Sequence, residues 1–136
     1  MWQEERARWR EYLAENDPEM LKELDAQDEK EAMEAFAGKM AFGTGGLRSV
    51  LGVGPARMNV YTVARATQGL AQAILKSKAP HTVAIAYDTR KNSDVFALTA
   101  ARVLMTNGIK AITVTSENVD DYEEYWICLL YTSDAA

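Results

Sequence analysis

One stretch of this sequence combines clustered glycines with an arginine, a combination suited to phosphate binding. The segment GTGGLR, residues 43–48, places three glycines just before Arg48. Glycines let the backbone form a concave anion nest and approach a ligand closely. Arginine stays charged, and its planar guanidinium matches phosphate oxygens. The predicted phosphate-binding residues here are Thr44, Gly45, Gly46 and Arg48.

The glycine-rich stretch has an alternative interpretation that involves no ligand. No Gly-Lys-Ser/Thr follows it, as a Walker loop requires, and no strand-turn-helix context surrounds it, as a dinucleotide fingerprint requires. A lone glycine cluster is more often a hairpin or bulge than a binding site. The alternative is therefore a hairpin whose arginine points to solvent.

Short helices are predicted before this stretch, in residues 1–40. Asp17 followed by Pro18 marks a helix start, and Asp28 with Glu31 has the spacing of a capping box. We predict two or three helices whose apolar stripe packs on a neighbouring face, with their charges solvated. The predicted stripe comprises Trp2, Trp9, Tyr12, Leu13, Leu21, Leu24, Met33, Phe36, Ala37 and Met40.

After the glycine-rich stretch, the pattern predicts a helix over 59–78, a strand over 82–87, a helix over 94–108 and a strand over 110–115. Asn59 is a plausible cap for the first of these helices. A strand, a helix and a strand in about 30 residues form a βαβ unit with parallel strands. The predicted fold class is therefore α/β, with N-terminal helices followed by a partial mixed or parallel sheet. The predicted buried helix residues are Val60, Val63, Thr67, Leu70, Ile74, Phe96, Ala100, Val103 and Leu104.

A second polar segment follows the first predicted strand of this unit. Asp88, Thr89 and Arg90 form a turn at its C-terminal end, which is where ligands bind in open parallel sheets. Arg90 is therefore predicted to lie near a phosphate or substrate site. The alternative is structural, because an Asp-Arg pair in a tight turn can also be a local salt bridge and helix cap.

Three regions are predicted along the chain. They are a helical extension (1–40), a partial α/β domain (41–116) and a tail (117–136). The tail does not continue the domain pattern, and its ending CLLYTSDAA resembles read-through of a sequencing adapter. An artefactual origin is one interpretation of this tail.

Composition excludes several classes of protein. With 136 residues, 48% of them hydrophobic, and a net charge of −5, the chain can bury one core but suits neither nucleic acid nor an anionic membrane. Its single cysteine, Cys128, forms no intrachain disulfide, and it reads as a bystander in the tail. No signal-peptide pattern or run of about 20 apolar residues is present. The expectation is a cytoplasmic protein.

Two blocks of the chain resemble one enzyme family. FGTGGLRSVLGVGPARMNVYTVARATQGLAQAI, followed by VAIAYDTRKNSDVFALTAARVLMTNGIKAITV, is similar to the N-terminal domain of the α-D-phosphohexomutases. The resemblance covers roughly residues 1–115 and is strongest to the phosphoglucomutase branch, which includes phosphopentomutases and phosphomannomutase-like members. It implies a four-domain isomerase that moves a phosphoryl group between the 1-position and the terminal carbon of a sugar phosphate. A phosphoserine donor, assistance by Mg²⁺ and a sugar bisphosphate intermediate are also implied.

The resemblance assigns roles to matching residues. Residues 43–48 match the family motif beside the phosphoserine, so Arg48 would help to neutralise its phosphate. Arg57 and Asn59 match the family's Arg-Met-Asn segment and are expected to have supporting roles. Residues 88–90 match the family's Asp-x-Arg turn, which makes Arg90 a candidate phosphate-binding residue.

Departures from the family pattern suggest a fragment that is inactive by itself. The catalytic serine motif T-A-S-H-N-P is absent, and Ser116 in TSEN reads as an ordinary loop serine. The metal loop is absent too, so no metal ligand is predicted here; residues 119–121 read as a solvated turn and His81 as a surface residue. Mg²⁺, sugar phosphate and sugar bisphosphate thus belong to the full-length enzyme. The alternatives are an independent phosphate-binding α/β domain and a non-catalytic interaction module.

Overall fold

The computed structural model describes residues 1–40, 42–43, 46–78, 80–87, 90–114 and 126–129. These residues form five helices and two small sheets. The chain divides into two compact units, one ending at Asn59 and one beginning at Val60. No helix in the described ranges is long and apolar enough to cross a membrane.

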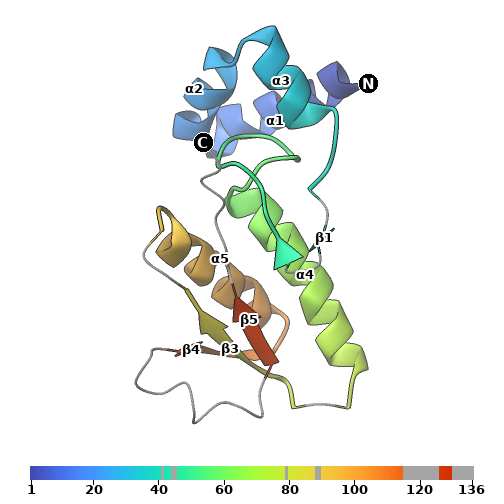
Figure 1. Cartoon of the computed structure of the whole chain (residues 1–136), viewed down its shortest axis with the longest axis vertical. Coiled ribbons are helices and arrows are strands. Elements are labelled where there is room, and N and C mark those ends of the chain that lie inside the picture. The colour runs from blue at the N-terminus through green and yellow to red at the C-terminus, as the bar shows by residue number, and fades with distance from the viewer. Residues whose placement is uncertain (41, 44–45, 79, 88–89, 115–125, 130–136) are drawn as a thin grey trace. The chain divides into compact units, whose positions relative to one another are not determined.

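The first unit begins with three short helices, as predicted. They are α1 (Trp2–Asn16), α2 (Pro18–Ala26) and α3 (Glu29–Phe36), and α1 packs against both of the others (Figure 1). Leu13 of α1 and Leu24 of α2 are fully buried. The rings of Trp9 and Phe36 meet edge to face, with their centroids 5.8 Å apart. This small apolar core joins helices that are individually too short to be stable in water.

Polar caps define where α2 and α3 begin, and both predicted caps are confirmed. The Asp17 carboxylate accepts a hydrogen bond from the Met20 N–H at 3.2 Å, and Pro18 occupies the first turn of α2. The Asp28 carboxylate accepts from the Glu31 N–H at 2.8 Å, while the Glu31 carboxylate accepts from the Asp28 N–H at 3.0 Å. These bonds satisfy N–H groups that have no partner within the helix.

The predicted apolar stripe of these helices is partly wrong. Tyr12 and Met33 are 53% and 47% exposed. Helix α3 instead buries two alanines and Phe36. One of those alanines, Ala35, lies so close to Gly54 that a Cβ placed on Gly54 would overlap it. The buried face of α3 is therefore the one that carries Ala32, Ala35 and Phe36, and Met33 lies outside it.

A short hairpin and a long loop complete the first unit. Strand β1 (Phe42–Gly43) pairs antiparallel with β2 (Gly46–Leu47). The following segment, residues 48–59, is called the 48–59 loop below. An isolated bridge joins its Leu51 and Met58, so the loop folds back on itself. It groups with the three helices, whereas the domain limits proposed at residues 40 and 116 stay predictions.

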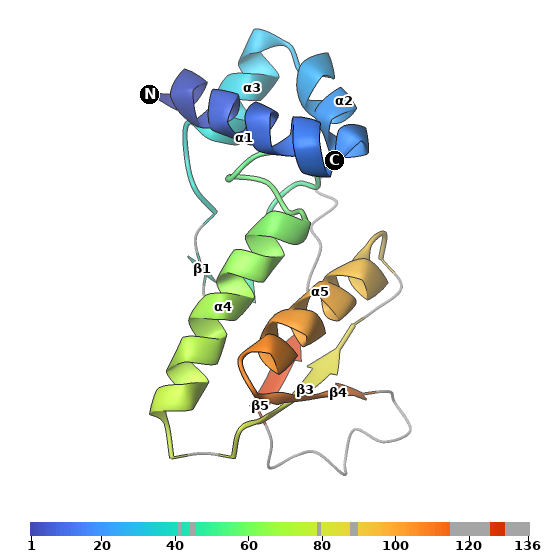
Figure 2. The ribbon, with the colours of Figure 1, turned by 180° about the vertical axis from the view of Figure 1, so that it is seen from behind.

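The second unit is the predicted βαβ unit, preceded by one helix and extended by one strand. Its elements are α4 (Val60–Lys76), β3 (Thr82–Ala86), α5 (Ser93–Thr106), β4 (Lys110–Val114) and β5 (Trp126–Leu129). Strand β3 is central and pairs in parallel with β4 and with β5. Helices α4 and α5 lie side by side, and α5 packs on β3 and β4 (Figures 1 and 2). The α/β fold class is confirmed.

Local patterns predicted the βαβ unit well. The consecutive residues 83–85 of β3 are all buried, as expected for a strand covered on both faces. Helix α5 ends at the predicted stop, where Gly108 has a φ of 77° and its N–H donates to the carbonyl of Met105 at 3.0 Å. Glycine adopts this left-handed conformation at little cost.

The buried face of α4 was predicted only in part. Val63, Thr67 and Ile74 are buried as expected. Val60 and Leu70 are only half-buried. The remaining buried positions of α4 are Thr62 and Ala71.

Strand β5 was not predicted. Its residues lie in the segment interpreted as a tail outside the domain, yet they pair with β3 from Trp126 opposite Val83 to Leu129 opposite Ala86. The sequence WICL is rich in residues that favour strands. Its partner strand, β3, lies about 40 residues earlier in the chain, so the local sequence does not indicate this pairing.

Candidate phosphate site

Arg48, the principal candidate, directly follows the β1–β2 hairpin and is exposed. Gly43 pairs with Gly46 across this hairpin. Thr44 and Gly45, which stand between them, lie outside the described residues. The hairpin considered as the alternative is therefore present, and it leaves the arginine at the surface, where a phosphate could reach it. The phosphate role of Thr44, Gly45, Gly46 and Arg48 stays a prediction.

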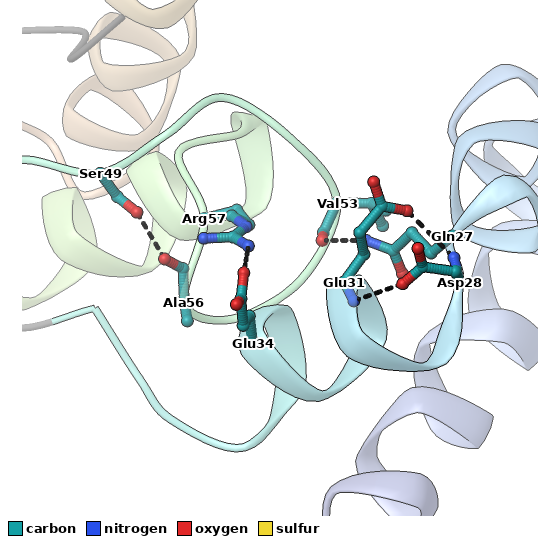
Figure 3. Close-up of polar contacts among 8 residues, drawn as sticks. All are labelled: Gln27, Asp28, Glu31, Glu34, Ser49, Val53, Ala56 and Arg57. Atoms are coloured by element: carbon teal, nitrogen blue, oxygen red, sulfur yellow. Dashed lines mark hydrogen bonds and ion pairs between the residues drawn. The ribbon is translucent and has the colours of Figure 1, made fainter. Parts of the chain in front are cut away.

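Ser49, the residue just after Arg48, is linked to helix α3 through Ala56, and Figure 3 shows the bond between Ser49 and Ala56. The hydroxyl of Ser49 donates a hydrogen bond to the carbonyl of Ala56 at 2.5 Å. The N–H of Ala56 in turn donates to the carbonyl of Ala35 in α3 at 3.1 Å. The 48–59 loop is closed further by the Met58 N–H, which donates to the carbonyl of Val50 at 2.8 Å.

Gly54 shows why the loop is rich in glycine. Its φ is 125°, and a Cβ placed on it would lie 2.7 Å from the carbonyl oxygen of Ala35 and 2.9 Å from the Ala35 side chain. No side chain fits at that distance, and this conformation is one that residues with a Cβ rarely adopt. Gly52, with a φ of 152°, is a second position of this kind. Gly54 thus serves packing against α3, whereas at Gly52 the backbone conformation alone favours glycine, because a Cβ there would meet no atom closer than 3.4 Å.

Asn59 holds the loop closed from inside. Only 3% of this residue is exposed. Its amide nitrogen lies 2.9 Å from the carbonyl oxygen of Gly52, 3.0 Å from that of Gly54 and 3.4 Å from that of Arg57. Buried carbonyls need such donors. This geometry fits the supporting role expected of Asn59, while its predicted capping of α4 stays a prediction.

Two side chains connect the loop to α3 and to the segment between α2 and α3 (Figure 3). The Arg57 guanidinium lies 3.5 Å from the Glu34 carboxylate of α3. The amide of Gln27 donates to the carbonyl of Val53 at 3.3 Å, and Val53 itself is fully buried. The loop that follows Arg48 is therefore held by side-chain contacts as well as by backbone bonds.

Arg90 lies where the sequence predicted, after β3 and before α5. It is exposed, and its carbonyl accepts a hydrogen bond from the N–H of Ser93 at 3.1 Å. Asn92 has a left-handed φ of 67° at the start of α5. Asp88 and Thr89 lie outside the described residues. Arg90 belongs to the second unit and Arg48 to the first.

The described residues offer no donor set that fits Mg²⁺. Among them, no group of three or more histidine, cysteine, aspartate or glutamate side chains is placed to hold a metal. His81 is exposed, as predicted. Ser116 and residues 119–121 lie outside the described residues.

Sequence reasoning did not single out Ser49 or Gly54, which organise the loop beside Arg48. The available signal was local: two glycines separated by one residue, followed by a proline and then an asparagine. That pattern indicates a tight loop in which a side-chain amide satisfies backbone carbonyls. It does not indicate which helix the loop packs against.

Comparison with known proteins gives a consistent picture. The family model for phosphoglucomutase/phosphomannomutase, alpha/beta/alpha domain I, matches residues 39–119. Similar relatives include a phosphoglucomutase of Staphylococcus saprophyticus, 43% identical over 88 residues, or 65% of this chain and 16% of the relative. A probable phosphoribomutase of Schizosaccharomyces pombe is 38% identical over 90 residues, or 64% of this chain and 15% of the relative.

The matches thus span only about a sixth of the length of these curated relatives, as the 16% coverage shows. No solved structure matches the chain. The family model nevertheless covers more than half of the chain and contains both the GTGGLR and the DTR segments. The chain therefore belongs to the phosphoglucomutase/phosphomannomutase family, through the alpha/beta/alpha domain I of that family.

Proposed function

We propose that this chain supplies the first domain of a phosphosugar mutase. Such an enzyme is an intramolecular phosphotransferase that interconverts a sugar 1-phosphate and a terminal-carbon phosphate, for example glucose 1-phosphate and glucose 6-phosphate, through a sugar bisphosphate. The observation that carries the proposal is the continuous family match over 39–119, which includes both candidate arginines. Relatives named phosphoglucomutase and phosphoribomutase support a hexose or pentose phosphate as substrate.

Arg48 is proposed to stabilise the phosphate of the enzyme's own phosphoserine during transfer. Phosphoryl transfer depends mainly on positioning and on fixed positive charge. An exposed arginine that follows a hairpin and precedes a tightly bonded loop meets both requirements. The backbone of Thr44, Gly45 and Gly46 and the guanidinium of Arg90 are proposed to bind substrate phosphate.

The phosphoserine and Mg²⁺ are proposed to be held by parts of the enzyme other than the residues described here. The family serine motif does not occur in this sequence, and the described carboxylates form no metal site. A cytoplasmic location is proposed as well. The two alternatives, an independent phosphate-binding domain and an interaction module, gain no specific support from the family match.

The test replaces Arg48 with lysine in a full-length enzyme. Residues 39–114 of this chain would replace the matching segment of the Staphylococcus saprophyticus phosphoglucomutase, which supplies the missing domains. Lysine keeps the charge but loses the bidentate fork. We expect kcat to fall about tenfold or more, which corresponds to at least about 1.4 kcal/mol of transition-state stabilisation. The KM for glucose 1-phosphate and the Tm should change little.

The matched control is Arg102→Lys, at an exposed arginine of α5, which should leave kcat unchanged. A wild-type kcat in the Arg48→Lys enzyme would refute the phosphate role. A fall in kcat with an equally marked fall in Tm would assign Arg48 to structure instead.

A further inference from the structure

Two consecutive hydrogen bonds connect helix α3 to Ser49, the residue that follows Arg48. The carbonyl of Ala35 accepts the N–H of Ala56 at 3.1 Å. The carbonyl of the same Ala56 accepts the Ser49 hydroxyl at 2.5 Å. Ser49 is bonded covalently to Arg48, so a side-chain bond fixes the backbone at the point where the arginine leaves the hairpin (Figure 3).

The anchor at the other end of this connection cannot easily shift. Gly54 lies so close to Ala35 that even a Cβ would overlap it. The Arg57–Glu34 ion pair adds a second link to α3, and the Gln27–Val53 hydrogen bond adds one to the segment between α2 and α3. Ala56 is therefore held in place against α3. Because the Ser49 hydroxyl is hydrogen-bonded to Ala56, it restrains the backbone of the adjacent Arg48.

We propose that Ser49 is a positioning residue, whose hydroxyl holds the backbone of Arg48 in the orientation that presents its guanidinium to phosphate. An arginine side chain is long and flexible, so a fixed backbone is needed to limit the positions that its guanidinium can occupy. Small displacements of a group that contacts a transferring phosphate cost much of its effect. This inference rests on the proposed function for its phosphate part, whereas the ordering of Arg48 by Ser49 can be measured without any ligand.

The test is hydrogen exchange, followed by mass spectrometry, on the 136-residue chain with and without inorganic phosphate at matched ionic strength. In the wild type we expect phosphate to slow exchange in the peptide around Arg48. Ser49→Ala should speed exchange there about fivefold without phosphate, as expected for the loss of one hydrogen bond, and should lose the protection by phosphate. Ser49→Thr, which keeps a hydroxyl, should restore both properties.

The matched control is Ser77→Ala. The Ser77 hydroxyl makes the same kind of bond, to the carbonyl of Ile74 at 2.8 Å, but at the end of α4 in the second unit. Its loss should leave exchange around Arg48 unchanged. Equal exchange in wild type and Ser49→Ala would overturn the inference whatever phosphate does.

Two further outcomes separate this inference from the proposed function. Faster exchange in Ser49→Ala that extends through α1 and α2 would show general unfolding of the first unit and overturn the positioning role. If Ser49→Ala loosens only the Arg48 peptide while phosphate protects nothing in the wild type, the positioning of Arg48 stands. The proposed phosphate site then fails.

Discussion

At Gly54, both the local backbone conformation and the tertiary packing require a residue without a Cβ. Its φ of 125° disfavours any residue with a Cβ, and the backbone of Ala35 occupies the space that a Cβ would need. Asn59 complements it by donating to the carbonyl of the same Gly54 at 3.0 Å. At the residue scale, therefore, the loop beside the candidate arginine has few acceptable substitutions.

We predict that Gly54→Ala destabilises the chain by about 3 kcal/mol, because it combines a strained φ with overpacking. Gly69→Ala is the matched control. Gly69 is in α4 with no atom within 4 Å of a Cβ placed on it, and alanine there should add about 0.5–1 kcal/mol of stability through helix propensity. Urea denaturation followed by tryptophan fluorescence and by circular dichroism measures both changes. A stability loss under about 0.5 kcal/mol for Gly54→Ala would contradict the close approach to Ala35.

Helix α3 is the element on which the 48–59 loop depends. It has only 8 residues, so its own hydrogen bonds do little to stabilise it. Its start is set by the reciprocal bonds of Asp28 and Glu31, and its last turn carries the Ala35 carbonyl that anchors Ala56. Weakening the cap should therefore loosen the loop as well as the helix.

We predict that Asp28→Ala lowers the free energy of unfolding by about 1 kcal/mol, because it removes the N-cap acceptor. Asp28→Asn should be nearly neutral, since asparagine caps helices about as well as aspartate. The denaturation midpoint in urea gives the stability, and hydrogen exchange of the 48–59 peptide reports the effect on the loop. Equal midpoints for the alanine and asparagine variants would show that the cap contributes nothing measurable.

At the scale of the whole molecule, the chain shows two compact units and matches about a sixth of the length of its curated relatives. We predict no mutase turnover from the 136-residue chain with glucose 1-phosphate, because its sequence contains no T-A-S-H-N-P serine motif to carry the phosphoryl group. A coupled assay for glucose 6-phosphate, on protein free of host mutase, checks this. Turnover above a no-protein control would contradict the proposal that this chain is only part of the enzyme.

The sequence by itself determined the features that depend on near neighbours. The caps at Asp17 and Asp28 and the stop at Gly108 arise from contacts within a few residues, so their chemistry can be read locally. The continuous apolar run of β3 was one of the patterns that predicted the βαβ unit. The order of GTGGLR before DTR indicated the family, which the family model over residues 39–119 confirms.

Only the tertiary structure decided which surfaces meet. Met33 is exposed, whereas Ala35 is buried and lies against Gly54, which is distant in sequence. Strand β5 exists because β3 offers it a parallel edge. In each case the deciding partner lies many residues away. The physical reason is that periodicity records how apolar a helix face or strand is, whereas the partner's shape decides which side chains that face can bury.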